Sequence, residues 1–214
     1  MDSSLRITEI FYSLQGESNT VGIPTVFVRL TGCPLRCSYC DTSYAFSGGE
    51  KQTLSQIIAR IELFRCRFVT ITGGEPMAQP ACPELMTMLA DKGYCVSLET
   101  SGAINLAAVD SRIVKVMDLK TPSSGEMQRN DYSNIEYLTG QDQVKFVIAD
   151  QHDYQWSKQL IQDYQLDSKC QLLFSPVESS LPAVELAEKI LADRLPVRFQ
   201  IQLHKYLWND ARGK

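Results

Sequence analysis

The 214-residue chain lacks several features that define broad protein classes. It contains no run of about eighteen apolar residues, so we expect no helix that crosses a bilayer. Its start, MDSSLRITEIFYSLQGE, lacks the basic and then apolar segments of a secretory signal, which favours a cytoplasmic protein. Long runs of Lys and Arg are also absent, and the formal net charge is −4. We therefore expect neither a nucleic-acid partner nor a membrane partner.

Histidine is scarce, with two residues, whereas cysteine occurs seven times, at positions 33, 37, 40, 66, 82, 95 and 170. A reducing cytoplasm keeps such thiols from pairing, and an odd number cannot form a complete disulfide framework. Metal or redox chemistry is therefore the favoured use of the cysteines. With 44% hydrophobic and 21% charged residues, the chain can bury a core without disulfides.

Segments typical of strands and helices alternate along the chain, without an internal repeat or a long linker. We expect strands at residues 25–30, 68–72, 94–100, 113–119, 143–149, 170–176 and 197–203, and helices at 53–64, 83–93, 153–164 and 182–192. This alternation predicts a parallel sheet with helices outside it. Such a sheet is too small for a closed eight-stranded barrel. The expected fold class is therefore α/β, a partial, open (β/α) barrel with about six parallel strands.

The polar and glycine-rich motifs follow the expected strands, and the carboxyl ends of parallel strands are where α/β folds bind ligands. These motifs are GCPLRCSYCDT at 32–42, TGGEP at 72–76, ETSG at 99–102, DLKTPSSGE at 118–126, SPV at 175–177 and QLHK at 202–205. We expect them to surround one site.

Cys33, Cys37 and Cys40 form a C-x3-C-x2-C motif with no packing periodicity. Structural zinc is usually bound by four N or S ligands in two close pairs, and this loop supplies three. Thiolates also bind iron–sulfur clusters, and three of them leave one iron of a four-iron cluster open to another ligand. We favour the open cluster, and zinc stays as the alternative. The candidates for a fourth zinc ligand are Cys66, Cys82, Cys95 and His204.

The cysteine motif, with Tyr39 inside it and GGEP at 73–76, resembles the signature of the radical S-adenosylmethionine (SAM) superfamily. The resemblance implies a [4Fe–4S] cluster on Cys33, Cys37 and Cys40 whose open iron binds SAM. In that superfamily an electron from the cluster cleaves SAM and releases a 5′-deoxyadenosyl radical. The resemblance also implies an electron donor of the flavodoxin or ferredoxin type.

A longer series of motifs resembles the 7-carboxy-7-deazaguanine synthase family: SLQGE at 13–17, the cysteine motif, ITGGEP, ETSG, PSSGE and QLHKYLW, which ends at residue 208. Enzymes of this family are carbon–nitrogen lyases of queuosine and 7-deazapurine biosynthesis. They convert 6-carboxy-5,6,7,8-tetrahydropterin to 7-carboxy-7-deazaguanine by a radical ring contraction that releases ammonia. The resemblance implies this activity, a dependence on Mg²⁺ and a homodimer.

The resemblance also implies roles for individual residues, none of them as a protein acid or base. The expected substrate-binding residues are Leu14, Gln15, Gly16, Glu17, Arg29, Thr72, Glu99 and His204. The expected SAM-binding residues are Tyr39, Gly74, Glu75, Ser101, Asp118, Leu119, Lys120 and Ser175. Thr42 is the expected Mg²⁺ ligand. Asp118 and Leu119 depart from the Ser-Pro-Lys pattern that the family often has at this place.

We expect a single radical SAM domain over residues 1–214, with an N-terminal substrate-binding extension over about 1–24 and a C-terminal cap over about 196–214. Two alternatives stay open. A glycyl-radical-enzyme activase shares the cysteine and TGGEP motifs but acts on a partner protein, for which it needs a groove. A non-catalytic iron–sulfur or zinc module needs a fourth protein ligand.

The radical SAM interpretation predicts that SAM changes the electron paramagnetic resonance signal of the reduced cluster, because SAM becomes a ligand of its open iron. The measurement is a SAM titration of the anaerobically reconstituted and reduced protein. A cluster with four protein ligands has no open iron. A signal that SAM leaves unchanged would therefore contradict the interpretation.

Overall fold

The computed structural model describes residues 3–209 and 211–214, and in this part of the chain the backbone forms one nine-stranded sheet. The strands are β1 (Ser4–Leu14), β2 (Pro24–Leu30), β3 (Glu50–Thr53), β4 (Phe68–Gly73), β5 (Cys95–Thr100), β6 (Val114–Leu119), β7 (Gln143–Ile148), β8 (Gln171–Pro176) and β9 (Arg198–Phe199). Their order is β3-β1-β2-β4-β5-β6-β7-β8-β9. Neighbours from β2 to β9 are parallel, whereas β1 is antiparallel to both β2 and β3.

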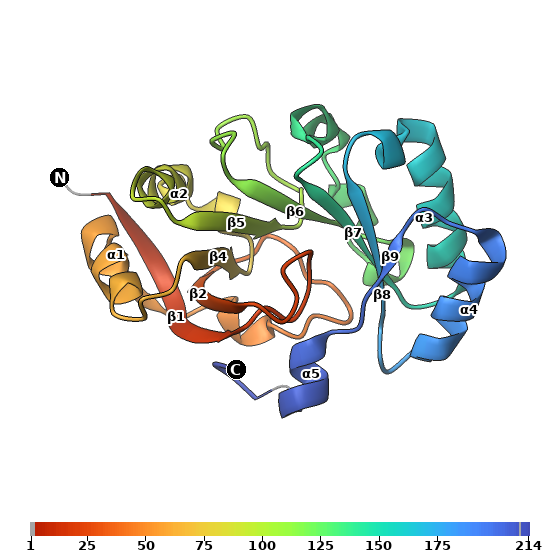
Figure 1. Cartoon of the computed structure of the whole chain (residues 1–214), viewed down its shortest axis with the longest axis horizontal. Helices are drawn as coiled ribbons and strands as arrows, with labels where there is room; N and C mark the ends of the chain where they lie inside the picture. Colours follow the sequence, from red (N-terminus) through yellow and green to blue (C-terminus); the bar gives the residue numbers. More distant parts are fainter. Residues whose placement is uncertain (1–2, 210) are drawn as a thin grey trace.

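The expected open (β/α) barrel is confirmed. The two edge strands, β3 and β9, lie at opposite ends of the strand order and do not pair within the described residues. The six longer parallel strands match the expected ones to within a residue or two at each end. Figure 1 shows the strands as a curved fan whose two ends stay apart.

Four longer helices cover the outside of the sheet: α1 (Leu54–Glu62), α2 (Cys82–Asp91), α3 (Gln151–Tyr164) and α4 (Ala183–Asp193). In Figure 1, α1 and α2 lie beside the first strands, and α3 and α4 lie beside β7 and β8. α1 begins at a capping box in which Thr53 and Gln56 each bind the other's backbone N–H. No helix in the described part of the chain is long and apolar enough to span a membrane.

Successive side chains of a strand point to opposite sides of the sheet, so the two faces of each parallel strand have different surroundings. In β7, Val144 and Phe146 belong to the hydrophobic core under the helices. Phe146 packs edge-on against Trp156 of α3 and Phe174 of β8. Lys145 faces the inside of the open barrel instead. The helices therefore fix the outer face, and the inner face is free to form a site.

Three elements differ from the sequence-based expectation. β1 and β3 were not expected, and they extend the sheet beyond β2 at one edge. Figure 1 shows β1 next to β2. Of the strand expected at 197–203, only Arg198 and Phe199 form a strand, because pairing with β8 ends at Phe199. The rest of this expectation is wrong. The chain then forms the short helix α5 (Leu203–Trp208), which lies below the strands in Figure 1.

Candidate active site

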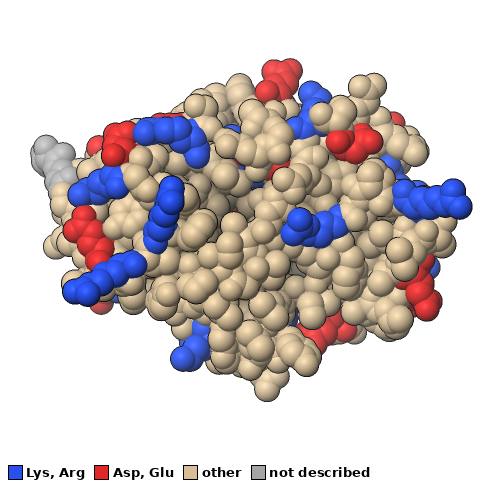
Figure 2. Space-filling view, in the orientation of Figure 1, with Lys and Arg blue, Asp and Glu red and all other residues tan. Residues whose placement is uncertain are grey.

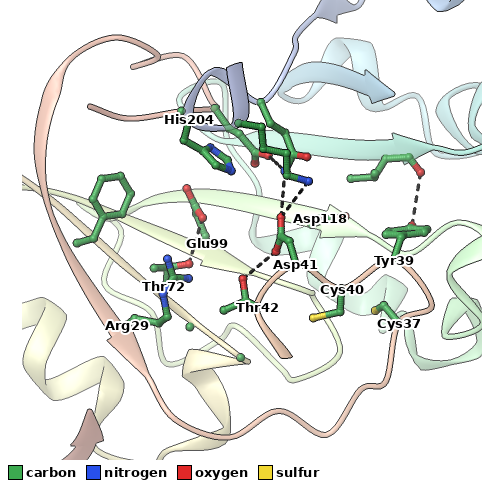
Figure 3. A pocket seen from close by; sticks show the side chains of 18 of the residues that line it. Arg29, Cys37, Tyr39, Cys40, Asp41, Thr42, Thr72, Glu99, Asp118 and His204 are labelled. Carbon is green, nitrogen blue, oxygen red and sulfur yellow. Dashed lines mark hydrogen bonds and ion pairs between the residues drawn. The ribbon is translucent and has the colours of Figure 1, made fainter. Parts of the chain in front are cut away.

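A cavity of about 660 Å³ opens at the carboxyl ends of the parallel strands. Its wall combines the loop after β1, the cysteine loop after β2, the ends of β4 to β7, α5 and residues 211–214. Figure 3 labels side chains of this cavity that come from β2, the cysteine loop, β4, β5, β6 and α5. The volume is within the roughly 300–1,000 Å³ of small-molecule sites.

Cys33, Cys37 and Cys40 are free, partly buried, and part of the cavity wall. No three His, Cys, Asp or Glu side chains in the described part of the chain converge as ligands of one metal ion. Zinc needs such convergence, whereas a four-iron cluster is larger and each thiolate binds a different iron. Of the candidates for a fourth zinc ligand, Cys66, Cys82 and Cys95 lie outside the cavity wall, whereas His204 lines it. The donor set therefore fits an open cluster better than zinc.

Burial also affects the protonation of the cysteine loop. Burial raises the pKa of Cys33, and it raises the pKa of Cys37 to about 11 against the opposing charge of Lys120. Both are therefore thiols at neutral pH until a metal displaces their protons. The backbone N–H of Leu35 donates to Cys33 Sγ over 3.4 Å, a contact of the kind that tunes cluster thiolates.

The GGEP turn packs directly against the start of this loop. Gly74 N donates to Leu30 O over 3.2 Å, and Glu75 N donates to Gly32 O over 2.9 Å. A Cβ on Gly74 would overlap Gly32 O and the Cys33 side chain. Gly73 has a φ of +143°, which non-glycine residues rarely adopt. The two glycines thus allow the close approach that orients the cysteine loop.

Glu75 does not line the cavity, although the sequence assigned it to SAM. Its carboxylate is fully buried and accepts hydrogen bonds from Met77 N, Thr100 Oγ1, Ser101 N and Ser101 Oγ, over 2.6 to 3.0 Å. It ties the turn after β4 to the end of β5. Leu119 and Ser175 also lie outside the wall, Leu119 within the hydrophobic core.

The other residues assigned to SAM line the cavity: Tyr39, Gly74, Ser101, Asp118 and Lys120. Asp118 Oδ2 lies 3.1 Å from Lys120 Nζ and 3.3 Å from Lys145 Nζ. Burial opposes the charge of Asp118, but these two ammonium groups outweigh it and lower its pKa. Asp118 Oδ1 is buried without a hydrogen-bond partner among the described residues. A charged acceptor without a partner suits a ligand hydroxyl or N–H.

All eight residues assigned to the substrate line the same cavity. Glu99 is the centre of one group of them (Figure 3). Gln15 Nε2 donates to Glu99 Oε1, and Thr72 Oγ1 donates to Glu99 Oε2, both over 3.1 Å. Two hydrogen bonds leave a carboxylate with further acceptor sites, so Glu99 can also accept from a ligand.

Arg29 combines an ion pair with free donors. Its Nε lies 2.7 Å from Glu9 Oε1, and Glu9 is its cross-strand partner in β1. Its guanidinium lies near the rings of Phe11 and Tyr44, with Cζ 5.7 and 5.8 Å from the centroids. Within the described residues, no hydrogen bond uses the Nη atoms of Arg29. These donors can therefore form a fork for a carboxylate.

The loop after β1 is held by α5. Leu203 N donates to Gly16 O over 3.0 Å. A Cβ on Gly16 would collide with the ring of His204, so the imidazole lies directly on the Gly16 backbone. Two segments far apart in the sequence therefore form one side of the cavity.

Thr42 lies at the cavity wall, where its hydroxyl donates to Asp41 Oδ1 over 2.8 Å (Figure 3). Asp41 Oδ2 lies 3.6 Å from Lys205 Nζ. Mg²⁺ prefers oxygen ligands and takes few of them from protein. The neighbouring hydroxyl and carboxylate oxygens fit such an ion.

The sequence did not single out two parts of the wall. Lys145 looked like an ordinary residue of a strand, and its partners are distant in sequence. Residues 211–214 were expected only as part of the C-terminal cap; they line the cavity, and Arg212 Cζ lies 4.2 Å from the centroid of the Tyr44 ring. The signal available for Lys145 was its charge, because it lies among the side chains of β7 that face the inside of the barrel.

The surface differs from the cavity. Figure 2 shows Lys and Arg side chains interspersed with Asp and Glu on the face seen in Figure 1, with wide uncharged areas between them.

Comparison with known proteins gives consistent matches. Residues 27–164 match the family model described as the radical SAM superfamily. The 7-carboxy-7-deazaguanine synthase of Chlorobaculum tepidum is 44% identical over 99% of this chain and 98% of its own. The enzyme of that name from Koribacter versatilis is 40% identical over 98% of this chain and all of its own.

Two solved structures share the fold. The crystal structure of QueE from Escherichia coli has a TM-score of 0.79 and 22% identity, covering 94% of this chain and 95% of that one. SuiB of Streptococcus suis bound to its precursor peptide SuiA has a TM-score of 0.59 and 11% identity, covering 80% of this chain and 46% of that one.

The buried carboxyl of Glu99 gives a prediction for pH. Burial raises its pKa, and the charge of Glu17 adds to this shift. The folded protein therefore keeps the Glu99 proton to a higher pH than the unfolded chain, whose carboxyl has a pKa of 4.5. The stability from this group is present below that pKa and is lost as pH rises through the folded pKa.

Glu99→Gln has no proton to lose. Its unfolding free energy, relative to the wild type, should therefore increase as the pH rises from about 4.5 toward neutral. Urea denaturation over a series of pH values measures this difference. A difference that stays constant with pH would contradict the raised pKa.

Proposed function

Because this chain belongs to the 7-carboxy-7-deazaguanine synthase family of the radical SAM superfamily, we propose that it converts 6-carboxy-5,6,7,8-tetrahydropterin to 7-carboxy-7-deazaguanine and ammonia. The family makes it a radical SAM enzyme of 7-deazapurine biosynthesis that uses a [4Fe–4S] cluster and SAM. The observation that carries the proposal on the substrate is the cavity, in which the Gln15 loop, Arg29 and the cysteine loop share one wall.

In this proposal, Cys33, Cys37 and Cys40 hold the cluster, and the cavity beside them binds SAM. The bound cluster and SAM supply the one-electron chemistry that starts the reaction. Asp118 Oδ1, a buried acceptor that has no hydrogen-bond partner in the described part of the chain, would accept a hydrogen bond from SAM. Gly74 supports the cysteine loop, and this half-buried residue borders the cavity.

The substrate would lie on the other side of the cavity. The free Nη donors of Arg29 fit its carboxylate in a forked geometry, because Glu9 already fixes the direction of the guanidinium. Gln15 and Glu99 would bind the edge of the pterin ring, which presents N–H donors and acceptors. Fixing both ends of the pterin orients its reacting carbon and supplies part of the rate acceleration. The enclosed wall also limits competing hydrogen donors.

Several further proposals rest on the family resemblance. Thr42, with Asp41 beside it, would bind Mg²⁺ together with oxygens of the substrate. A flavodoxin- or ferredoxin-type protein would supply the electron, the enzyme would act in the cytoplasm, and it would form a homodimer. We also propose that residues 1–214 act as one domain. The hydrogen bonds from Ser18 N to Gln200 Oε1 and from Leu203 N to Gly16 O support this, because they join the N-terminal extension to the C-terminal cap.

The experiment that tests the function is an anaerobic reaction of the reconstituted protein with SAM, Mg²⁺, a reductant and 6-carboxytetrahydropterin. Mass spectrometry should detect 7-carboxy-7-deazaguanine in amounts that exceed the amount of SAM consumed, since the family regenerates SAM. Cleavage of SAM without the deazaguanine acid would contradict the substrate and keep the radical SAM assignment. An activase would also cleave SAM, but only a partner protein would be its productive acceptor.

Arg29→Lys should raise the KM for the substrate by about 10- to 100-fold, because a lysine cannot form the fork and one hydrogen bond to a charged group is lost. Steady-state kinetics measures this change. The control is Arg112→Lys, a surface arginine paired with Asp91 and Asp110. Equal KM values for the two variants would count against the carboxylate role of Arg29.

Thr42→Val should raise the Mg²⁺ concentration needed for half-maximal activity by about tenfold or more, because the nearly isosteric valine removes one oxygen ligand. Thr42→Ser keeps the hydroxyl and should stay close to the wild type. Magnesium titrations of the three proteins decide the point. An unchanged titration for Thr42→Val would remove Thr42 as a ligand.

A further inference from the structure

Lys145 is a buried charge in the middle of the cavity wall that no part of the proposed function uses. It extends from the inner face of β7, and its side chain is 10% exposed. Burying an ammonium group is costly unless partners compensate for the lost water. The contacts of Lys145 therefore indicate what it does.

Two carboxylates from different elements compensate for this burial. Lys145 Nζ contacts Glu17 Oε2 in the loop after β1, and it lies 3.3 Å from Asp118 Oδ2 in β6. Burial opposes the ammonium form, but Glu17, Asp118 and Glu99 outweigh it and raise the pKa of Lys145. Lys145 thus stays charged at neutral pH, and it bridges the two sides of the cavity.

The carboxylate of Glu17 is occupied by the protein itself. While Lys145 binds Oε2, Gln202 Nε2 donates to Oε1 over 2.7 Å. Glu17 is also 7% exposed. Both oxygens of Glu17 therefore bind the protein and hold the loop in place. Gln15 and Gly16 of the same loop line the cavity.

Hydrogen bonds hold the same loop as well, from the Gln15 side chain to Glu99 and from two backbone N–H groups to glutamine side chains. Ser18 N donates to Gln200 Oε1, and Asn19 N donates to Gln143 Oε1, both over 2.9 Å. Ser18 also has a φ of +66°, a conformation that a non-glycine residue adopts at some cost. An ion pair at Glu17 holds the chain in this turn.

We propose that Lys145 is a positioning residue, which fixes Glu17 of the substrate loop relative to Asp118 of the SAM side and so sets the distance between substrate and SAM. This inference rests on the proposed function for what the two sides bind. It assigns Glu17 to the anchoring of the loop rather than to direct contact with the substrate.

The test compares Lys145→Met with Lys115→Met in the full-length, anaerobically reconstituted protein. Lys115 is the matched control because it is also a buried strand lysine, 3.2 Å from Asp142 Oδ2, but it does not line the cavity. Loss of either lysine removes the ion pair of a buried carboxylate, Glu17 or Asp142, so both variants report general destabilisation. Only Lys145→Met should affect the loop.

The first measurement is hydrogen exchange of the peptide that covers residues 15–23, which needs no substrate and no turnover. Its amides should exchange at least tenfold faster in Lys145→Met and at the wild-type rate in Lys115→Met. Equal exchange in the two variants would overturn the positioning role. This result stands whether or not the proposed substrate is correct.

The second measurement is kinetic. Lys145→Met should raise the substrate KM at least tenfold and should release more 5′-deoxyadenosine per product than the wild type, because a displaced substrate receives the radical less often. Glu17→Gln, Lys145→Met and the double variant complete a cycle. If the two residues act as one anchor, the double variant is no worse than either single one.

The double variant also separates a specific effect from misfolding. It removes both charges of the Lys145–Glu17 pair together, so it leaves neither of them unpaired with the other. Additive effects on KM in the cycle would overturn the proposal. A wild-type protein that forms no deazaguanine product would refute the proposed function instead. In that case the exchange measurement alone decides whether Lys145 anchors the loop.

Discussion

The packing of two glycines against the first residues of the cysteine loop is the constraint on which the rest of the site depends. Parallel strands β2 and β4 end side by side, and the chains that leave them must pass within hydrogen-bond distance. Gly73 and Gly74 permit this approach, and Glu75 N then binds Gly32 O over 2.9 Å. The buried Glu75 carboxylate ties the same turn to Ser101 at the end of β5. The cysteines thereby leave the sheet in a fixed direction, toward the cavity.

The opposite side of the cavity is built from the two ends of the chain. The loop after β1 and the helix α5 contact each other through Gly16 and His204, and neither segment belongs to the parallel strands. Because an open barrel has no closing strand, these segments provide the missing wall. Lys145 connects this added wall to β6 through Glu17 and Asp118. The cavity is therefore one structure made of a sheet edge, the cysteine loop and the two end segments of the chain.

The parallel strands and the cysteine loop were predictable because their signals are local. Four of the six residues at 143–148 are β-branched or aromatic, and C-x3-C-x2-C is a contiguous motif. β1 was missed because a register shift between Ile7 and Glu9 breaks the alternation, which leaves Leu5, Ile7 and Ile10 buried at uneven spacing. The strand expected at 197–203 was wrong because pairing with β8 stops at Phe199, although β8 itself continues to Pro176.

The positions of the site residues depended on contacts that no local pattern contains. Glu75 and Leu119 belong to motifs at the right strand ends, but their side chains point into the protein. Lys145 and Glu17 are separated by 128 residues, and only the folded sheet brings them together. Sequence motifs therefore predicted which strand ends form the site. Tertiary packing decided which side chains reach it.

The most direct test of this account is an anaerobic crystal structure of the reconstituted protein with SAM and 6-carboxytetrahydropterin. The account predicts the pterin carboxylate on the Nη atoms of Arg29, the pterin edge against Gln15 and Glu99, and SAM between the pterin and the cysteine loop. A pterin bound outside this cavity, with Arg29 bound only to Glu9, would contradict it.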